Sequence, residues 1–188
     1  MKYIATVALM FSLGVAGVYA QERPVKMTFS GTVGPSPINL QQPNTQNSEE
    51  NYAGNGTLGA FTFRNISAET SSPQPSSACS GPTRLYFVRV AGAGVFRFQD
   101  GSLLIVTVKD GSGCIDLAAG NAALIVNYQI TGGTGRLTGA SGYLTLTATL
   151  VSVLFNASGG VVLATDTGKV EGTVFGVNID TEGRDDRQ

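Results

Sequence analysis

The chain has 188 residues, a formal net charge of −1 and 42% hydrophobic residues, which is the composition of an ordinary globular protein. Lys and Arg total 12 against 13 acidic residues and form no basic run, so we expect no nucleic-acid partner. Histidine is absent, which removes the commonest general base, the usual zinc or copper ligand and the Ser-His-Asp triad.

Residues 1–20 have the pattern of a secretory signal peptide. Lys2 gives a minimal positive start, an apolar run extends from Ile4 to Val18, and the run ends in a small-x-Ala pattern at Ala20. The run is shorter than the roughly 20 residues that a membrane-spanning helix needs, so an uncleaved anchor is the less favoured alternative. We therefore expect cleavage after Ala20, no membrane insertion of the mature chain, and a secreted protein that is periplasmic or extracellular.

The mature chain begins with a strand pattern followed by a polar stretch. Val25, Met27 and Phe29 alternate with polar residues, which predicts a strand with one buried face that ends near Val33. Residues 34–53 contain three prolines, several Asn and Gln and a pair of adjacent glutamates. Because such a composition buries little apolar surface, we predict a long exposed loop there.

Strand character returns over residues 56–66, with Phe61 and Phe63 on one face. Residues 67–83 are rich in Ser and Pro, which predicts a second long loop. Short strand-patterned runs separated by turn residues then follow to the end of the domain. These predicted strands cover residues 84–91, 94–99, 102–109, 114–117, 122–130, 143–155, 161–165 and 169–179.

Asp100-Gly101 lies between two of these runs and is a strong hairpin signal. A type I′ turn needs positive φ at both central positions, which Asp-Gly tolerates, so the flanking strands are predicted to be antiparallel neighbours. In total, about nine or ten short strands predict a single all-β domain over residues 21–179. The charged residues 180–188 are expected to be a disordered tail, and we expect no metal site in this solvated segment.

Residues 130–143 place five glycines between two strand-patterned runs, which predicts a sharp strand-to-strand corner. Within them, Gly132-Gly-Thr-Gly-Arg-Leu-Thr-Gly-Ala-Ser-Gly142 resembles the glycine signature of the allene oxide cyclase and dirigent barrels and of related uncharacterised secreted bacterial proteins. Leu137 stands where those families usually have Phe. The resemblance implies a closed antiparallel β-barrel of about eight strands, which we favour over a two-sheet β-sandwich. It also implies a homo-oligomer, since barrels of these families are often trimers.

Cys79 and Cys114 are the only cysteines of the chain, and both lie in the part expected to be exported. In an oxidising compartment they are predicted to form one disulfide. The loop it closes is a few tens of residues, which corresponds to about 3 to 4 kcal/mol of stabilisation in the chain-entropy model. A reactive thiol pair is the alternative, but there is no Cys-x-x-Cys spacing and no histidine to lower a thiol pKa.

Few residues are candidates for chemistry in a barrel lumen. Arg84 and Arg89 fall on opposite faces of the predicted strand 84–91, so one of them points inward. The orientation is open for three further residues: Arg97, Tyr128 and Glu171. The resemblance implies that Asp, Arg and Tyr groups steer a reactive intermediate in dirigent proteins, and that a Glu and a bound water assist cyclisation in allene oxide cyclase. Only the glycine segment aligns, so no catalytic residue is assigned.

Three functions remain open from the sequence. The favoured one is non-catalytic: binding of a small apolar ligand in a lumen open at one end, or surface interaction. The second is an isomerase or cyclase that uses neither metal nor histidine, which predicts an inward carboxylate and arginine in one cavity and a perturbed carboxylate pKa. The third is a structural protein with a barrel filled by side chains. No cofactor is expected in any of the three.

Overall fold

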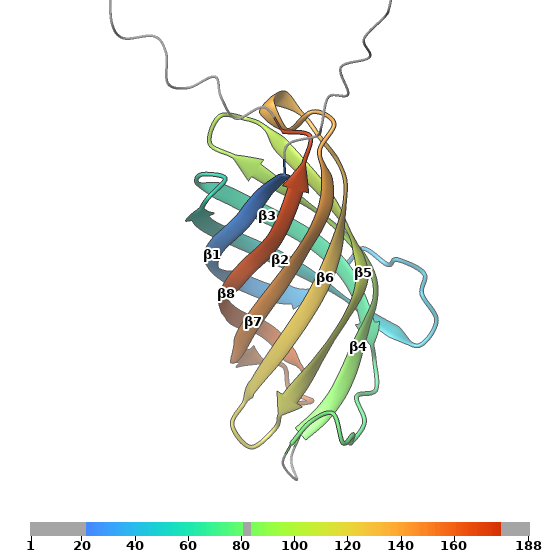
Figure 1. Cartoon of the computed structure of the whole chain (residues 1–188). Helices are drawn as coiled ribbons and strands as arrows, with labels where there is room; N and C mark the ends of the chain where they lie inside the picture. The colour runs from blue at the N-terminus through green and yellow to red at the C-terminus, as the bar shows by residue number, and fades with distance from the viewer. Residues whose placement is uncertain (1–21, 81–83, 178–188) are drawn as a thin grey trace, which may run out of the picture.

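The computed structural model describes residues 22–80 and 84–177. Within them, eight antiparallel strands form one closed barrel, in which each strand pairs with its neighbours along the chain and the last pairs with the first (Figure 1). The strands are β1 (Glu22–Pro35), β2 (Thr45–Gly56), β3 (Phe61–Thr70), β4 (Arg84–Phe98), β5 (Leu103–Asp116), β6 (Asn121–Gly133), β7 (Ser141–Phe155) and β8 (Val161–Phe175). The predicted antiparallel barrel is therefore confirmed, and the alternative of a two-sheet sandwich is not found.

The predicted signal peptide, residues 1–20, and the predicted tail, residues 180–188, lie outside the described residues. Among the residues that are described, no helix has the length and hydropathy needed to cross a membrane.

The strands are fewer and longer than the sequence predicts, because several apparent breaks lie inside continuous strands. Glycine and polar residues interrupt the hydrophobic pattern at these points, yet the backbone pairing continues through them. The false breaks are residues 67–70 in β3, 92–93 in β4, 110–113 in β5 and 166–168 in β8.

Two of the interrupting glycines make room for aromatic rings inside the barrel. Gly113 pairs with Phe87, and a Cβ atom at Gly113 would lie 2.5 Å from the Phe87 ring. Gly168 pairs with Phe29, and a Cβ atom at Gly168 would lie 2.8 Å from that ring and 2.1 Å from the Thr147 carbonyl oxygen. Each ring therefore covers the glycine opposite it. These two glycines, which interrupt the hydrophobic pattern of the sequence, are part of the core packing.

The long exposed loop predicted over residues 34–53 is wrong in its second half, where β2 begins. The side chains of Ser48, Glu50 and Tyr52 alternate inward and are buried. Period-2 alternation is present there, but it places polar rather than apolar side chains inside. A search for hydrophobic periodicity therefore assigns this strand to a loop.

The hairpin predicted at Asp100-Gly101 is confirmed, since β4 and β5 pair on either side of it. The type I′ geometry is wrong, because Gly101 has φ of 84° while Asp100 is not among the described non-glycine residues with positive φ. The amide of Gly101 donates to the Phe98 carbonyl and the amide of Phe98 donates to the Ser102 carbonyl, both at 2.9 Å. This is the three-residue loop that ends in a left-handed glycine.

The glycine-rich segment forms the predicted corner between β6 and β7 and covers one end of the barrel. It contains a single 3₁₀ turn, η1 (Gly135–Leu137), whose Leu137 side chain is fully buried in the core. The Arg136 guanidinium fixes the corner, donating from Nε to the Asp100 carboxylate at 2.7 Å and from an Nη atom to the Leu58 carbonyl at 2.5 Å. This end, where β1 begins and β8 ends, is closed by side chains.

The opposite end of the barrel carries the connections β1–β2, β3–β4, β5–β6 and β7–β8 (Figure 1). The disulfide between Cys79 and Cys114 joins the β3–β4 connection to β5, which confirms the predicted pairing. The tip of the β7–β8 hairpin exposes a run of apolar side chains. The most exposed of them are Val153, Leu154 and Phe155.

Candidate functional site: a cavity above a buried polar cluster

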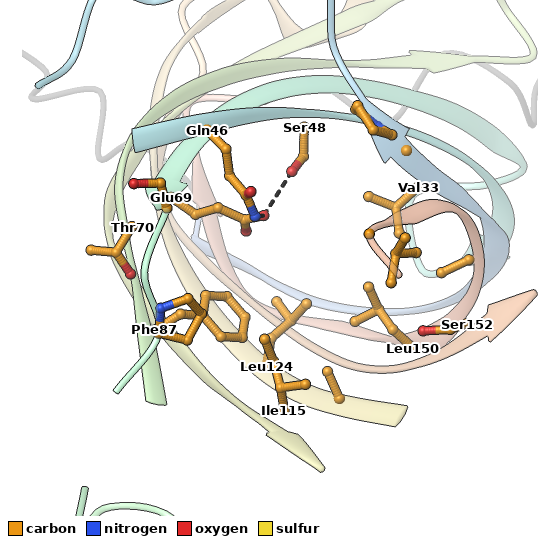
Figure 2. A pocket seen from close by; sticks show the side chains of 18 of the residues that line it. Val33, Gln46, Ser48, Glu69, Thr70, Phe87, Ile115, Leu124, Leu150 and Ser152 are labelled. Carbon is orange, nitrogen blue, oxygen red and sulfur yellow. Dashed lines mark hydrogen bonds between the residues drawn. The ribbon is translucent and has the colours of Figure 1, made fainter. Parts of the chain in front are cut away.

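A cavity of about 460 Å³ opens at the disulfide-bearing end of the barrel (Figure 2). Its two sides differ in chemistry. The polar side comes from β2 and β3 and presents Gln46, Ser48, Glu69 and Thr70. The other side is mainly apolar, with Val33, Ile115, Leu124 and Leu150, and also includes Ser152 beside Leu150. The volume lies within the range of small-molecule sites, about 300 to 1,000 Å³.

A bulge in β4 directs Arg89 into the barrel beneath this cavity. Before the bulge the odd-numbered side chains, Phe87 and Arg89, are buried, and after it the even-numbered Phe96 and Phe98 are buried. The register against β3 shifts at the same place, between Ala68 and Glu69. One extra residue in a strand exchanges the faces occupied by odd-numbered and even-numbered side chains. The bulge therefore lets Phe87 and Arg89 before it, and Phe96 and Phe98 after it, all point into the barrel.

Arg89 and Glu50 form a buried ion pair at the centre of the barrel. The distance from a terminal guanidinium nitrogen of Arg89 to Glu50 Oε1 is 2.6 Å, and the two side chains are 3% and 1% exposed. Glu50 also accepts hydrogen bonds from Ser67, at 3.1 Å, and from the amide nitrogen of Asn65. A buried carboxylate is tolerated only with such partners, and Glu50 has three.

Glu69 lies at the boundary between the ion pair and the cavity. Its Oε1 accepts hydrogen bonds from Ser48 at 2.9 Å and from Gln46 at 3.2 Å. Its Oε2 lies 3.5 Å from the second terminal nitrogen of Arg89, a longer contact than the one to Glu50. Arg89 is thus shared between two carboxylates and is held mainly by the deeper one.

Asp166 on β8 contributes a third inward carboxyl group. The Tyr52 hydroxyl donates to Asp166 Oδ2 at 2.5 Å. Burial raises the pKa of Asp166 to about 7, and the negative charge of Glu50 acts in the same direction, while the Tyr52 hydrogen bond and Arg89 oppose the shift. Burial also raises the pKa of the Tyr52 phenol well above its usual value, so Tyr52 is the neutral donor of this pair.

Several buried polar atoms in this region make no hydrogen bond. We define the polar cluster as Glu50, Tyr52, Asn65, Ser67, Arg89, Tyr128 and Asp166. Within it, Asn65 Oδ1, Arg89 Nε, Tyr128 Oη and Asp166 Oδ1 have no hydrogen-bond partner among residues 22–80 and 84–177. Burial raises the pKa of Tyr128, which keeps its hydroxyl neutral, and Arg89 lies close enough to act in the opposite direction. The polar cluster therefore has unused donors and acceptors, which are uncommon in folded proteins.

Two of the candidate lumen residues point inward and three do not. Arg89 and Tyr128 are buried in the polar cluster, so the inward arginine of the predicted strand is Arg89. The others lie on the outer surface. Arg84 pairs with Asp116 at 3.3 Å, Glu171 pairs with Lys169 at 2.6 Å, and Arg97 is exposed.

Sequence reasoning missed the four remaining groups that define the site: Glu50, Glu69, Tyr52 and Asp166. Three of these residues lay in the segments interpreted as polar loops. The available signal was the alternation of Ser48, Glu50 and Tyr52 with more exposed residues, which has the period of a strand but the composition of a loop.

The described residues bring together no group of three or more His, Cys, Asp or Glu side chains suited to a metal ion. The polar cluster contains carboxyl, phenol, amide, hydroxyl and guanidinium groups.

No family model and no curated protein matches the chain. Among solved structures it is similar to two pterocarpan synthase dirigent proteins, GePTS1 and PsPTS1. The match to GePTS1 has 16% identity and a TM-score of 0.38 and covers 89% of this chain and 99% of that one. The match to PsPTS1 has 14% identity and a TM-score of 0.44 and covers 85% of this chain and 98% of that one. These proteins belong to the kind of barrel that the glycine segment was expected to resemble, but at these identities and TM-scores the matches carry no argument about this chain.

Proposed function

We propose that this protein binds a small, largely apolar molecule in the cavity at the open end of its barrel. The observation that carries the proposal is the cavity itself, about 460 Å³ with one apolar side formed by residues of β1, β5, β6 and β7. A cavity of this size with a mainly apolar side and a few polar groups has the general character of small-molecule sites. The interior differs from the wholly apolar lumen expected of a simple hydrophobic carrier, since its other side is polar.

The primary test is native mass spectrometry of protein exported and purified without denaturant. We expect a small molecule on the native species that is lost when the same sample is denatured. The covalent mass would also report cleavage after Ala20 and the two hydrogens lost in the disulfide.

A pair of tryptophan variants tests whether the cavity is the binding site. Leu150 lines the cavity, whereas the adjacent Val151 is 50% exposed on the outer surface of the same strand. Leu150→Trp should occupy the cavity and abolish binding, and Val151→Trp should bind as the parent does. The chain has no tryptophan, so each variant carries a single indole whose emission reports its burial. Unchanged binding by both variants would place the ligand elsewhere.

A second candidate function is a proton-assisted rearrangement in the barrel, favoured by Asp166. Its pKa of about 7 leaves this carboxyl group partly protonated near neutral pH, so it is able to donate or accept a proton. The test compares the molecules carried by the wild type and by Asp166→Asn produced in the same host. An enzyme should carry its product in the wild type and its unconverted substrate in the variant, whereas a binding protein should carry the same molecule in both.

A further inference from the structure

We propose that the cavity selects molecules bearing a protonated amine. The Glu69 carboxylate binds the ammonium group, and the apolar side of the cavity contacts the hydrocarbon part of the ligand. This inference rests on the proposed binding function and specifies its ligand class.

The charges around the cavity favour a cation. Among the described lining residues, the charged ones are Glu69 and Arg89. Arg89 already faces two carboxylates, Glu69 and the deeper Glu50, so these three groups leave one net negative charge. In a poorly solvated interior, an uncompensated charge attracts the opposite charge more strongly than it would in water.

The Glu69 carboxylate has room to accept further hydrogen bonds. An ionised carboxylate offers about four lone-pair sites. At Glu69, Oε1 receives two hydrogen bonds from neutral donors, Ser48 and Gln46, while among the described residues the polar contact of Oε2 is the one with Arg89 at 3.5 Å. An ammonium group carries three donors and no acceptor, which complements this oxygen.

An aromatic ring also lines the cavity, away from the proposed anchor. Phe87 lies beside Leu124, and Glu69 and Ser48 lie across the opening from them (Figure 2). Phe87, Leu124 and Leu150 would therefore contact the hydrocarbon part of a ligand whose ammonium group is held by Glu69.

Binding of an anion at Arg89 is the competing possibility. The Arg89 side chain is only 3% exposed, and its terminal nitrogens are engaged by Glu50 and Glu69. An anionic ligand would have to approach past the Glu69 carboxylate and compete with it for the guanidinium. The arrangement therefore disfavours carboxylate and phosphate head groups.

The test is calorimetric titration of the ligand-stripped protein at pH 7.5 with octylamine, octanol and octanoate, which share one chain length and differ in head group. Octylamine is protonated at this pH and octanoate is ionised. We expect octylamine to bind about tenfold more tightly than octanol, and octanoate to bind most weakly, since a charge-assisted hydrogen bond contributes on this order.

Glu69→Gln should remove the advantage of octylamine over octanol while leaving octanol binding nearly unchanged. The matched control is Glu49→Gln, which removes a carboxylate that pairs with Arg64 outside the cavity at 2.8 Å and should preserve the advantage. Octanoate binding as tightly as octylamine would overturn the amine preference and leave the binding function standing. Failure of all three probes to bind would overturn the inference about the ligand class, while the binding function is decided separately by native mass spectrometry. If Glu69→Gln does not fold, the order of the three probes on the wild type still decides between these outcomes.

Discussion

Replacing Asp166 by Asn should make the protein more stable at alkaline pH and flatten the dependence of its stability on pH. Asp166 has a pKa of about 7 in the folded protein, against 3.8 for an unperturbed aspartate. Because folding raises the pKa of Asp166, the folded protein favours the protonated carboxyl group. The stability that this group contributes is fully present below about pH 4 and is lost as the pH rises through about 7. The shift of about 3 pKa units corresponds to about 4 kcal/mol at pH 8, at 1.36 kcal/mol per unit.

The asparagine substitution is well suited to this test because it preserves the main contact of the side chain. An amide oxygen can still accept the hydrogen bond that Tyr52 donates to Asp166, and no charge needs to be buried at any pH. At pH 8 we therefore expect a gain of a few kcal/mol in the free energy of unfolding. At pH 4 the wild type and the variant should have nearly equal stability.

The assay is urea unfolding at intervals between pH 4 and pH 8.5, with the disulfide intact. A control on the same strand is Glu171→Gln, since Glu171 lies on the outer surface beside Lys169 and should show no comparable change in pH dependence. Parallel stability profiles for the wild type and Asp166→Asn would refute the reasoning, because they would mean that Asp166 is as readily ionised in the folded chain as in the unfolded one.

Three further outcomes are expected in the same unfolding assay. Arg89→Met should cost about 3 to 5 kcal/mol, because it leaves Glu50 buried without its cation, and adding Glu50→Met should restore part of that loss. Reducing the disulfide, or replacing Cys79 and Cys114 by Ser, should cost about 3 to 4 kcal/mol, as expected for a loop closed by residues 35 apart. Gly113→Ala should cost about 1 to 3 kcal/mol, because the new Cβ meets both the Phe87 ring and the Ala123 carbonyl oxygen, and Phe87→Leu in the same chain should relieve the part of the clash due to the ring. Strictly additive effects of Gly113→Ala and Phe87→Leu would contradict this account.

Local patterns in the sequence predicted the barrel well where its interior is apolar. β1 and β7 are examples, since Val25, Met27 and Phe29 in the former and Leu144 and Leu146 in the latter all point into the core as the alternation predicts. The glycine-rich corner and the disulfide were also predicted correctly, because each depends on a few residues with distinctive chemistry.

The candidate site was not predicted, because it depends on polar side chains that are buried by long-range pairing. Glu50 becomes an interior residue only because Asn65, Ser67 and Arg89 are brought to it from two other strands. Hydrophobic periodicity does not detect β2, because its inward side chains are polar. The bulge that turns Arg89 inward has no separate sequence signal either. Prediction from one sequence therefore failed where the barrel interior is polar.

An even number of antiparallel strands places both ends of the domain at the same end of the barrel. β1 begins and β8 ends side by side (Figure 1), at the end closed by Leu137. The residues that line the cavity lie toward the other end, where the disulfide is. A tag, a surface linker or a fused partner joined before Glu22 or after Phe175 would thus attach at the closed end. Immobilised through either attachment, the protein would present its mouth to the solution, which suits it to surface-based binding assays without redesign.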